Sequence, residues 1–473
     1  MSNIQEALEH IRKTGTNDTE RGSAFERLTK IFLENDATQL QQFSEVWHYE
    51  DWAKGRSVSQ KDIGIDLVAK LRDEDGYCAV QCKFYQPEHS ISKADLDSFI
   101  SASNTPDFIR LLLVDTSTQS IGKNAQSVFN NLTQDYTRIQ LSELEESRID
   151  WMTYVRAGEV RQRSKKELRD HQIQALEAIR EGLEEDDRGK LIMACGTGKT
   201  FTTLWIKERI SAETVLVLVP SLSLLSQILR EWTFACNTPF DVLCVCSDQS
   251  VGKRSNEDEI IQSVNDVPFP VTSDVQEIGD FIKGNGHKVI FSTYQSSPLI
   301  KESQSNPEVP TFDLVIADEA HRCVGKVDSD FATVLDVKKI RSKKRLFATA
   351  TPRTYSVSLK KSASERGVDV FGMDDEKVFG NEFYVLAFGE AIERGLLTDY
   401  QVVIVGVDNP MIAEYIERRE LVKTESGDIT DAESLASQIG LIKAIKDYDL
   451  KRMISFHSRV KRAETFASGI KSS

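Results

Sequence analysis

Residues 190–210 read KLIMACGTGKTFTTLWIKERI, and this stretch determines the fold class of the longer part of the chain. An apolar run of strand type leads into a glycine-rich turn, and a segment with helical patterning follows. Further apolar runs come later, at residues 214–220, 240–246, 288–294, 312–318 and 344–350. Near-continuous apolar strands indicate a parallel sheet that helices cover on both faces. We therefore predict an α/β domain over residues 168–405.

The glycine-rich turn GTGKT has the composition of a phosphate-binding loop, which would consist of Gly196, Thr197, Gly198, Lys199 and Thr200. Glycines let backbone amides approach a phosphate, and the N-terminus of the following helix favours the anion. We expect Lys199 to reach the β and γ phosphates of ATP and Thr200 to ligate Mg²⁺. The full pattern G-x4-GK[ST] is not met, because Met193 stands at its first glycine position. A plain glycine turn is the alternative interpretation.

A second motif, DEAH, begins where the apolar run of residues 312–318 ends. Asp318 is placed to hold the Mg²⁺ shell, and Glu319 is placed to polarise an attacking water. Two unrelated acids after a buried strand would give the same letters. Both motifs occur in the correct order on the expected elements, and this combination favours a site for ATP hydrolysis.

Residues 64–85, GIDLVAKLRDEDGYCAVQCKFY, predict a β-hairpin with an acidic turn. A turn centred on residues 74–75 sets Asp66 opposite Lys83, and a slip of two residues leaves them on one face together with Gln81. This set suits phosphodiester hydrolysis: Asp66 and Gln81 would hold Mg²⁺, and Lys83 would offset charge on the phosphorane. Ordinary solvated polar residues on a hairpin are the alternative.

Together with GSAFERL at residues 22–28, the letters GID and QCK resemble the core of PD-(D/E)XK nucleases in the Mrr-like variant, where glutamine replaces the second acid. The resemblance covers about residues 20–152, including the closing run RIQLSELEESRIDW. It implies catalytic roles for Glu26, Asp66, Gln81 and Lys83. Asp62 is interpreted as a loop residue outside this set.

Helical spacing of Phe25, Leu28, Ile31 and Phe32 predicts helix within residues 1–35. The apolar run at 108–118 predicts a buried strand, residues 93–102 and 123–136 predict helices, and residues 137–144 predict a last strand. We therefore expect a nuclease domain at 1–155 and a polar linker at 156–167.

Residues 168–405 resemble the first RecA-like domain of superfamily 2 helicases. LRDHQ looks like the adenine-side motif, with Gln172 as its glutamine, and VPSLSLLSQ, STYQS and ATATPR look like motifs Ia, Ib and III. The resemblance implies contact with the nucleic-acid backbone, or coupling of ATP state to it, for Ser221, Thr293, Thr349 and Thr351. Residues 249–287 form a charged insertion, expected to be loop plus helix, whose role the pattern does not indicate.

The later part of the chain resembles the passage into a second motor domain. Residues 388–405 are similar to the exit from the first domain in type I and type III restriction translocases, and residues 453–466 look like motif IV. We expect 406–473 to begin a second RecA-like domain, with a helix near 433–448 and a strand at 452–458. Motifs V and VI do not precede Ser473, so the expectation is a fragment or a naturally shortened motor.

An Mrr-like nuclease followed by such a motor resembles the front end of type ISP restriction–modification enzymes. The resemblance implies ATP-driven movement along double-stranded DNA and Mg²⁺-dependent cleavage in defence against phage and other foreign DNA. It also implies further C-terminal domains for methylation and target recognition. Three alternatives stay open: a stand-alone defence or repair helicase-nuclease without a methyltransferase, a non-cleaving DNA-binding helicase module, and an RNA helicase.

Composition sets few limits on this interpretation. The chain has 473 residues, and its seven cysteines include no C-x-x-C pair, which favours a reduced, cytoplasmic protein without a zinc site. No apolar run reaches membrane-spanning length, so no membrane partner is expected. The net charge of −15 argues only weakly against nucleic acid, because net charge does not describe a local groove.

Overall fold

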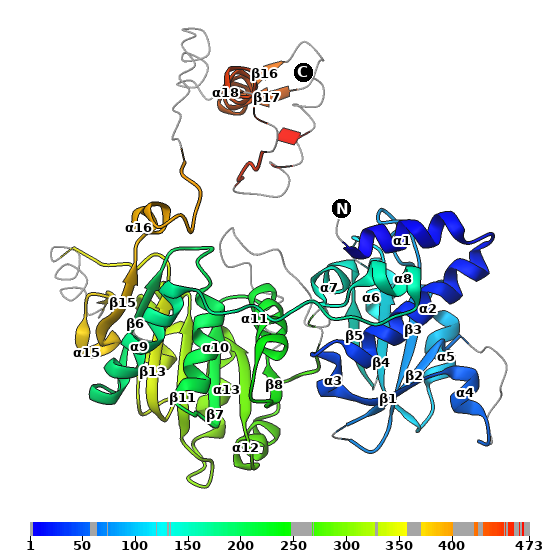
Figure 1. The fold of residues 1–473 in the computed structure, drawn as a ribbon, viewed down its shortest axis with the longest axis horizontal. Coiled ribbons are helices and arrows are strands. Elements are labelled where there is room, and N and C mark those ends of the chain that lie inside the picture. The colour runs from blue at the N-terminus through cyan, green and yellow to red at the C-terminus, as the bar shows by residue number, and fades with distance from the viewer. Residues whose placement is uncertain are drawn as a thin grey trace. The chain divides into compact units, whose positions relative to one another are not determined.

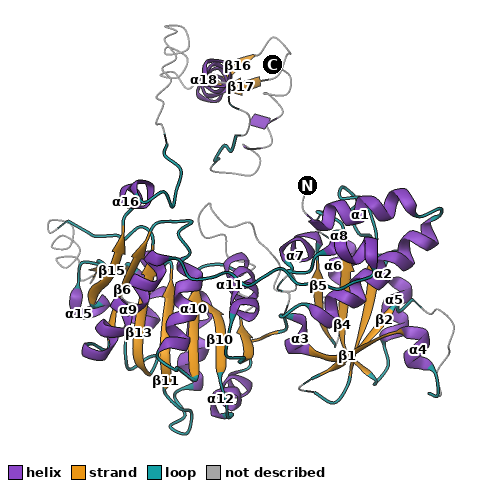
Figure 2. Ribbon diagram, in the orientation of Figure 1, coloured by secondary structure: helices purple, strands orange, loops and turns teal. Residues whose placement is uncertain are grey.

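Two β-sheets dominate the computed structural model, and the predicted α/β class is confirmed (Figures 1 and 2). The residues that the structure describes are 3–56, 64–72, 74–119, 121–129, 132, 134–246, 267, 269–326, 330–356, 370–400, 421–423, 429–448, 450, 453–457, 463 and 466–467. Asp62 and most of the insertion's first half lie outside this set.

The first sheet has five strands in chain order and is mixed. Its strands are β1 (Phe43–His48), β2 (Leu67–Leu71), β3 (Tyr77–Lys83), β4 (Phe108–Asp115) and β5 (Asp135–Ile139). The pairs β1–β2 and β2–β3 are antiparallel, whereas β3–β4 and β4–β5 are parallel. The antiparallel hairpin therefore ends beside parallel strands, and the carboxyl end of β3 lies at the carboxyl end of β4.

Helices cover both faces of this sheet. The core on one face includes residues of α1 (Asn3–Thr14), α2 (Asp18–Asn35), α7 (Leu141–Glu146) and α8 (Trp151–Ala157). The core on the other face includes residues of α4 (Tyr49–Ala53), α5 (Asp97–Ser103) and α6 (Lys123–Phe129), and the short α3 (Gln39–Gln42) precedes β1. The single helical segment expected near the N-terminus is two helices, because Asn17 caps α2 by accepting a hydrogen bond from the Glu20 amide.

Two details of the nuclease-like region correct the sequence prediction. The hairpin register places Leu67 opposite Val80, so Asp66 does not lie opposite Lys83. The turn closes earlier than expected: the Leu71 amide donates to the Gly76 carbonyl, and Glu74 within the turn forms an ion pair with Arg110 of β4. The last strand also stops at residue 139 rather than 144, since a capping box starts α7 immediately afterwards.

The second sheet has eight strands, and all its pairs are parallel. Across the sheet the strands are β15 (Asn381–Leu386), β6 (Arg188–Met193), β13 (Ser342–Thr349), β11 (Phe312–Asp318), β7 (Thr214–Val219), β10 (Lys288–Thr293), β8 (Asp241–Val245) and β9 (Val271–Thr272). The sequence predicted the six long apolar strands but not β9 or β15. Residues of β15 are mostly half-buried or exposed, which fits an edge strand without a continuous apolar run.

Helices also cover both faces of the parallel sheet. One face packs against α9 (Asp170–Glu185), α10 (Lys199–Arg209), α11 (Leu222–Ala235) and part of α16 (Phe388–Glu393). The other packs against α12 (Val275–Lys283), α13 (Ser297–Ser303), α15 (Glu376–Phe379) and the 3-10 turns η3 (Tyr294–Ser296), η4 (Ala320–Cys323) and η5 (Asp330–Leu335). A two-stranded ladder pairs β12 (Gly325–Lys326) with β14 (Val370–Phe371).

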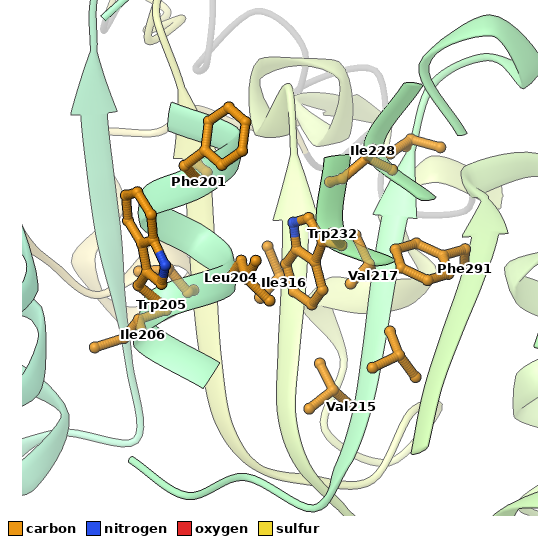
Figure 3. Close-up of a cluster of buried hydrophobic side chains, with 14 of the residues drawn as sticks. Phe201, Leu204, Trp205, Ile206, Val215, Val217, Ile228, Trp232, Phe291 and Ile316 are labelled. Atoms are coloured by element: carbon orange, nitrogen blue, oxygen red, sulfur yellow. The ribbon is translucent and has the colours of Figure 1, made fainter. Parts of the chain in front are cut away.

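Figure 3 shows the core that fixes α10 and α11 against the strands. Leu204 and Trp232 come from the two helices and pack with Ile316 of β11, and all three side chains are fully buried. Burial of a large apolar side chain contributes roughly 1.5–3 kcal/mol. The Trp232 indole also donates to the Thr200 carbonyl at 3.1 Å, so the core fixes the helix that begins at the glycine loop.

The described residues up to Leu397 belong to one compact unit, and those from Thr398 onward belong to a second. In the first unit, Arg230 of α11 forms ion pairs with Glu143 and Glu146 of α7. In the second, β16 (Leu421–Lys423) and β17 (Ile429–Asp431) form an antiparallel hairpin followed by α18 (Ala432–Tyr448). The strand predicted at 452–458 is absent from the described residues 453–457. No described helix is both long and apolar enough to span a membrane.

We expect the buried ion pair between Arg138 and Asp115 to be the polar contact on which the first sheet depends most. The guanidinium donates through Nε at 2.7 Å and through Nη2 at 3.0 Å, and both residues are almost fully buried. Arg138→Ala leaves a buried carboxylate without its cation, which should destabilise this region by about 3–5 kcal/mol. Arg161→Ala removes an exposed ion pair and should change little in the same urea unfolding experiment. Equal effects of the two substitutions would contradict this assignment.

Candidate active sites

The glycine loop adopts a conformation that only glycine accommodates easily. Gly196 and Gly198 have φ values of +82° and +93°. A Cβ on Gly198 would lie 2.5 Å from Nε2 of Gln172, which itself donates to the Gly198 carbonyl at 3.1 Å. Nε2 of His171 is 2.7 Å from the carbonyl of Thr197. Helix α9 thus holds the outside of the loop, and the loop has the backbone shape of an anion cradle.

Sheet order brings the glycine loop to the DEAH segment. The loop follows β6, the acids follow β11, and only β13 lies between these strands. Lys199 Nζ lies 2.9 Å from Oδ1 of Asp318 and 2.6 Å from Oε1 of Glu319. Burial lowers the pKa of Lys199, but the two carboxylates outweigh this effect and raise it overall. Lys199 is therefore protonated, and both carboxylates form ion pairs with its ammonium group.

Glu319 is held at both its side chain and its backbone. Its φ of +50° is left-handed, a rare conformation for a residue with a Cβ. Oε2 lies 3.2 Å from Nδ1 of His321, which is also 3.0 Å from the Thr349 hydroxyl at the end of β13. Burial raises the pKa of Glu319, but the hydrogen bond from His321 and the charge of Lys199 lower it to about 2. The carboxylate is thus ionised at neutral pH.

The other residues singled out in the motor region have varied positions. Gln172 uses its oxygen to accept from the Arg169 amide, so both ends of its side chain are bonded within the loop region. The Ser221 hydroxyl caps α11 by accepting from the Leu224 amide at 3.4 Å. Thr293 is buried, with its hydroxyl 3.0 Å from that of Ser296. Thr351 is exposed.

The nuclease candidates converge at the end of the hairpin. The Asp66 amide donates to the Val80 carbonyl, and Oδ2 of Asp66 accepts from the Cys82 amide at 2.6 Å. Nε2 of Gln81 donates to the same carboxylate oxygen. Side chains 81 and 83 share a face of β3. The structure thus brings Asp66 and Gln81 into direct contact despite the altered register.

Glu26 and Lys83 both affect the pKa of the Cys82 thiol. Burial raises the pKa of the Cys82 thiol, and the negative charges of Asp66 and Glu26 raise it further, whereas the charge of Lys83 acts in the opposite direction. All three groups are therefore close enough to Cys82 to act on its thiol. The β3–β4 register pairs Lys83 with Asp115, the carboxylate of the buried ion pair, so this ion pair supports the strand end that carries Lys83.

The donor set at this end of the hairpin fits a hard divalent cation. Oε1 of Gln81 is buried and has no hydrogen-bond donor in the described part of the chain. An unpaired buried oxygen is costly, and a cation beside Asp66 would satisfy it. No three His, Cys, Asp or Glu side chains converge as a metal cluster among the described residues, so an amide oxygen would be one of the ligands.

Comparison with known families agrees with these two sites. A family model described as a restriction endonuclease, of the Mrr catalytic type, matches residues 34–160, and one described as the res subunit of type III restriction enzymes matches residues 165–354. The chain joins an Mrr-like restriction endonuclease domain to a type III restriction helicase domain. The sequence-based expectation of this combination is confirmed.

Individual known proteins resemble nearly all or about half of the chain. The ATP-dependent type ISP restriction–modification enzyme LlaBIII, solved bound to DNA, superposes with a TM-score of 0.78 and 29% identity, covering 98% of this chain and 31% of that one. A probable helicase of African swine fever virus is 32% identical over 240 residues, which is 50% of this chain and 24% of the relative. The type I restriction enzyme EcoAI endonuclease subunit of Escherichia coli is 25% identical over 260 residues, covering 52% and 25%. The chain therefore spans only part of the length of each of these proteins.

Two residues of the helicase domain were not singled out from the sequence. His321 links Glu319 to Thr349, and the Tyr294 hydroxyl donates to the Asp318 carbonyl at 2.7 Å. Both stand inside quoted motifs, DEAH and STYQS, but their roles depend on how strands β10, β11 and β13 are ordered. Strand order is a long-range property that spacing along the chain does not contain.

We expect Gly198→Ala to weaken ATP binding about tenfold or more. The new Cβ displaces Gln172 and so disturbs the glycine loop that would hold the phosphates. Gly286→Ala is the matched control, since its φ of +86° imposes similar backbone strain but its Cβ would meet nothing within 4 Å. Fluorescent-nucleotide titration compares the two variants with the unmodified chain. Comparable losses of affinity would mean that backbone strain alone, and not the cradle, accounts for the effect.

Proposed function

We propose that this chain is the nuclease and motor part of an ATP-dependent restriction enzyme of the type ISP kind. It hydrolyses ATP to move along double-stranded DNA and cleaves that DNA with Mg²⁺, in defence against foreign DNA. The observation that carries the proposal is the presence of two separate acidic centres, Asp66 with Gln81 and Lys199 with its two carboxylates, in one chain. The likeness to LlaBIII over 98% of the chain supports it.

At the nuclease centre, Asp66, Gln81 Oε1 and Glu26 would hold Mg²⁺. When bound, the ion supplies Lewis-acid activation of the scissile phosphate and of a water. The Cys82 amide and Gln81 Nε2 orient the Asp66 carboxylate through their hydrogen bonds. Lys83 places an ammonium group on the same face of β3, where it offsets the charge that develops on the phosphate.

At the ATPase centre, Lys199 exchanges its carboxylate partners for the β and γ phosphates of ATP. Gly196, Thr197 and Gly198 present backbone amides to the same phosphates, and Gln172 holds the loop from the adenine side. Thr200 and Asp318 would hold the Mg²⁺ of the nucleotide. Glu319, released from the lysine and ionised at neutral pH, orients the attacking water and accepts its proton.

Of the residues proposed to link DNA to the motor, some are accessible to solvent and others are buried. Thr351 is exposed and Ser221 is half-buried at the start of α11, so both are assigned to contacts with the DNA backbone. Thr293 and Thr349 are buried, so they are assigned to coupling between DNA and ATP rather than to direct contact. The Thr349 hydroxyl suits this role because it lies against His321, the partner of Glu319.

Plasmid nicking tests the nuclease assignment. The unmodified chain should nick DNA in Mg²⁺ and not in EDTA, and Lys83→Ala should lower the rate about 100-fold or more by removing the charge that stabilises the transition state. Lys93→Ala removes an exposed lysine of the same domain and should leave nicking unchanged. Nicking by Lys83→Ala at the rate of the unmodified chain would refute the assignment of this centre.

Glu319→Gln tests the ATPase assignment, because the amide keeps the shape of the side chain but cannot accept a proton. We expect ATP to bind with similar affinity and turnover to fall by about 100-fold or more, as is typical when a general base is lost. Glu308→Gln changes a glutamate whose side chain is 80% exposed and should have no effect. Turnover of Glu319→Gln equal to that of the Glu308→Gln control would contradict the role of Glu319.

A further inference from the structure

The backbone of Glu319 is strained. Its φ and ψ are +50° and +45°, and Ser211 is the other non-glycine residue with a positive φ among those the structure describes. Such a conformation costs on the order of 1–3 kcal/mol and persists only where neighbouring groups hold it. The groups that hold the two peptides flanking Glu319 therefore determine where its carboxylate points.

A hydrogen bond to its carbonyl holds each of these peptides in place. In the peptide that follows Glu319, the carbonyl of Glu319 itself accepts a hydrogen bond from the Arg322 amide at 2.9 Å, which is a backbone bond at the start of η4. The carbonyl before it, that of Asp318, accepts from the Tyr294 hydroxyl at 2.7 Å. Tyr294 follows β10, and β7 separates β10 from β11, so this side chain reaches across one strand to hold the Glu319 backbone.

Packing fixes the ring of Tyr294 independently of its hydroxyl. The side chain is fully buried, and the ring stacks on Phe331 with a centroid distance of 5.2 Å. Burial raises the pKa of Tyr294 well above its ordinary value, so the hydroxyl keeps the proton that it donates. A phenylalanine at this position keeps the stacking and removes the hydroxyl, together with its hydrogen bond to the Asp318 carbonyl and its interaction with the Cys323 thiol.

We propose that Tyr294 is a positioning residue for Glu319, whose backbone it holds in the left-handed conformation through the Asp318 carbonyl. The proposal rests on the proposed role of Glu319 in ATP hydrolysis. Lys199 also holds the Glu319 carboxylate at 2.6 Å while no nucleotide is bound. ATP phosphates compete for that lysine, and the hydrogen bond from Tyr294 then becomes a larger share of what keeps Glu319 in place.

Tyr294→Phe tests the proposal by amide hydrogen exchange, measured on the chain with and without Mg²⁺ and a non-hydrolysable ATP analogue. The Arg322 amide should exchange about tenfold faster in the variant, the factor expected for loss of one buried hydrogen bond, with the larger change in the nucleotide-bound state. Nucleotide affinity should stay within about twofold, because the glycine loop is untouched. Tyr384→Phe removes a hydroxyl from the edge strand β15 and should alter neither quantity.

ATP turnover by the same proteins separates this inference from the function it rests on. If the unmodified chain hydrolyses ATP, Tyr294→Phe should lower kcat about tenfold and leave KM unchanged, which a general loss of folding would not do. Unchanged exchange at Arg322, or an unchanged kcat, would overturn the inference. Absence of turnover in the unmodified chain would count against the proposed ATPase function, and the exchange result would still decide the role of Tyr294.

Discussion

The ion pairs of Lys199 with Asp318 and Glu319 organise the carboxyl edge of the parallel sheet. The buried carboxylate of Asp318 and the half-buried one of Glu319 repel each other and lose hydration, and the ammonium group offsets part of both costs. The same ion pairs connect the glycine loop after β6 to the acids after β11, across β13. Without nucleotide, Lys199 therefore offsets part of the negative charge of this centre, and in the proposed function ATP displaces the carboxylates from it.

The negative charge of the nuclease centre is stabilised in a different way. The Asp66 carboxylate receives hydrogen bonds from neutral donors, the Cys82 amide and Gln81 Nε2. Beside it lies the buried amide oxygen of Gln81, which has no hydrogen-bond donor among the residues that the structure describes. That arrangement favours the arrival of a cation, because both the carboxylate and the orphaned oxygen gain from it. One chain thus contains an acidic centre whose charge its own lysine partly offsets and another that a divalent ion would complete.

Local patterns predicted most of this architecture. The long apolar strands, the glycine loop and the DEAH segment are each contained in a few consecutive residues, and hydrophobic runs and turn chemistry determine them directly. The hairpin register was missed because contacts distant in sequence, such as that of Glu74 with Arg110, act on the turn. The edge strand β15 was missed because it lacks an apolar run. The roles of His321 and Tyr294 depend on strand order, which spacing does not reveal.

The same distinction applies to the site residues. Contact between Asp66 and Gln81 could be anticipated, because alternation along strands survives a slip of two residues. The buried position of Thr293 could not, since burial depends on the turn η3 and its packing against η5. The sequence therefore predicted which candidate residues lie close together better than it predicted how each one is held.

Metal binding in the absence of nucleotide tests the central claim most directly. Mn²⁺ can replace Mg²⁺ as a probe, and electron paramagnetic resonance measures how much of it the protein binds. The account predicts a nucleotide-independent Mn²⁺ site in the unmodified chain, its loss in Asp66→Asn, and its retention in Asp135→Asn, which alters an exposed acid of the same domain. Absence of bound Mn²⁺ in the unmodified chain, or equal binding by Asp66→Asn, would contradict the account.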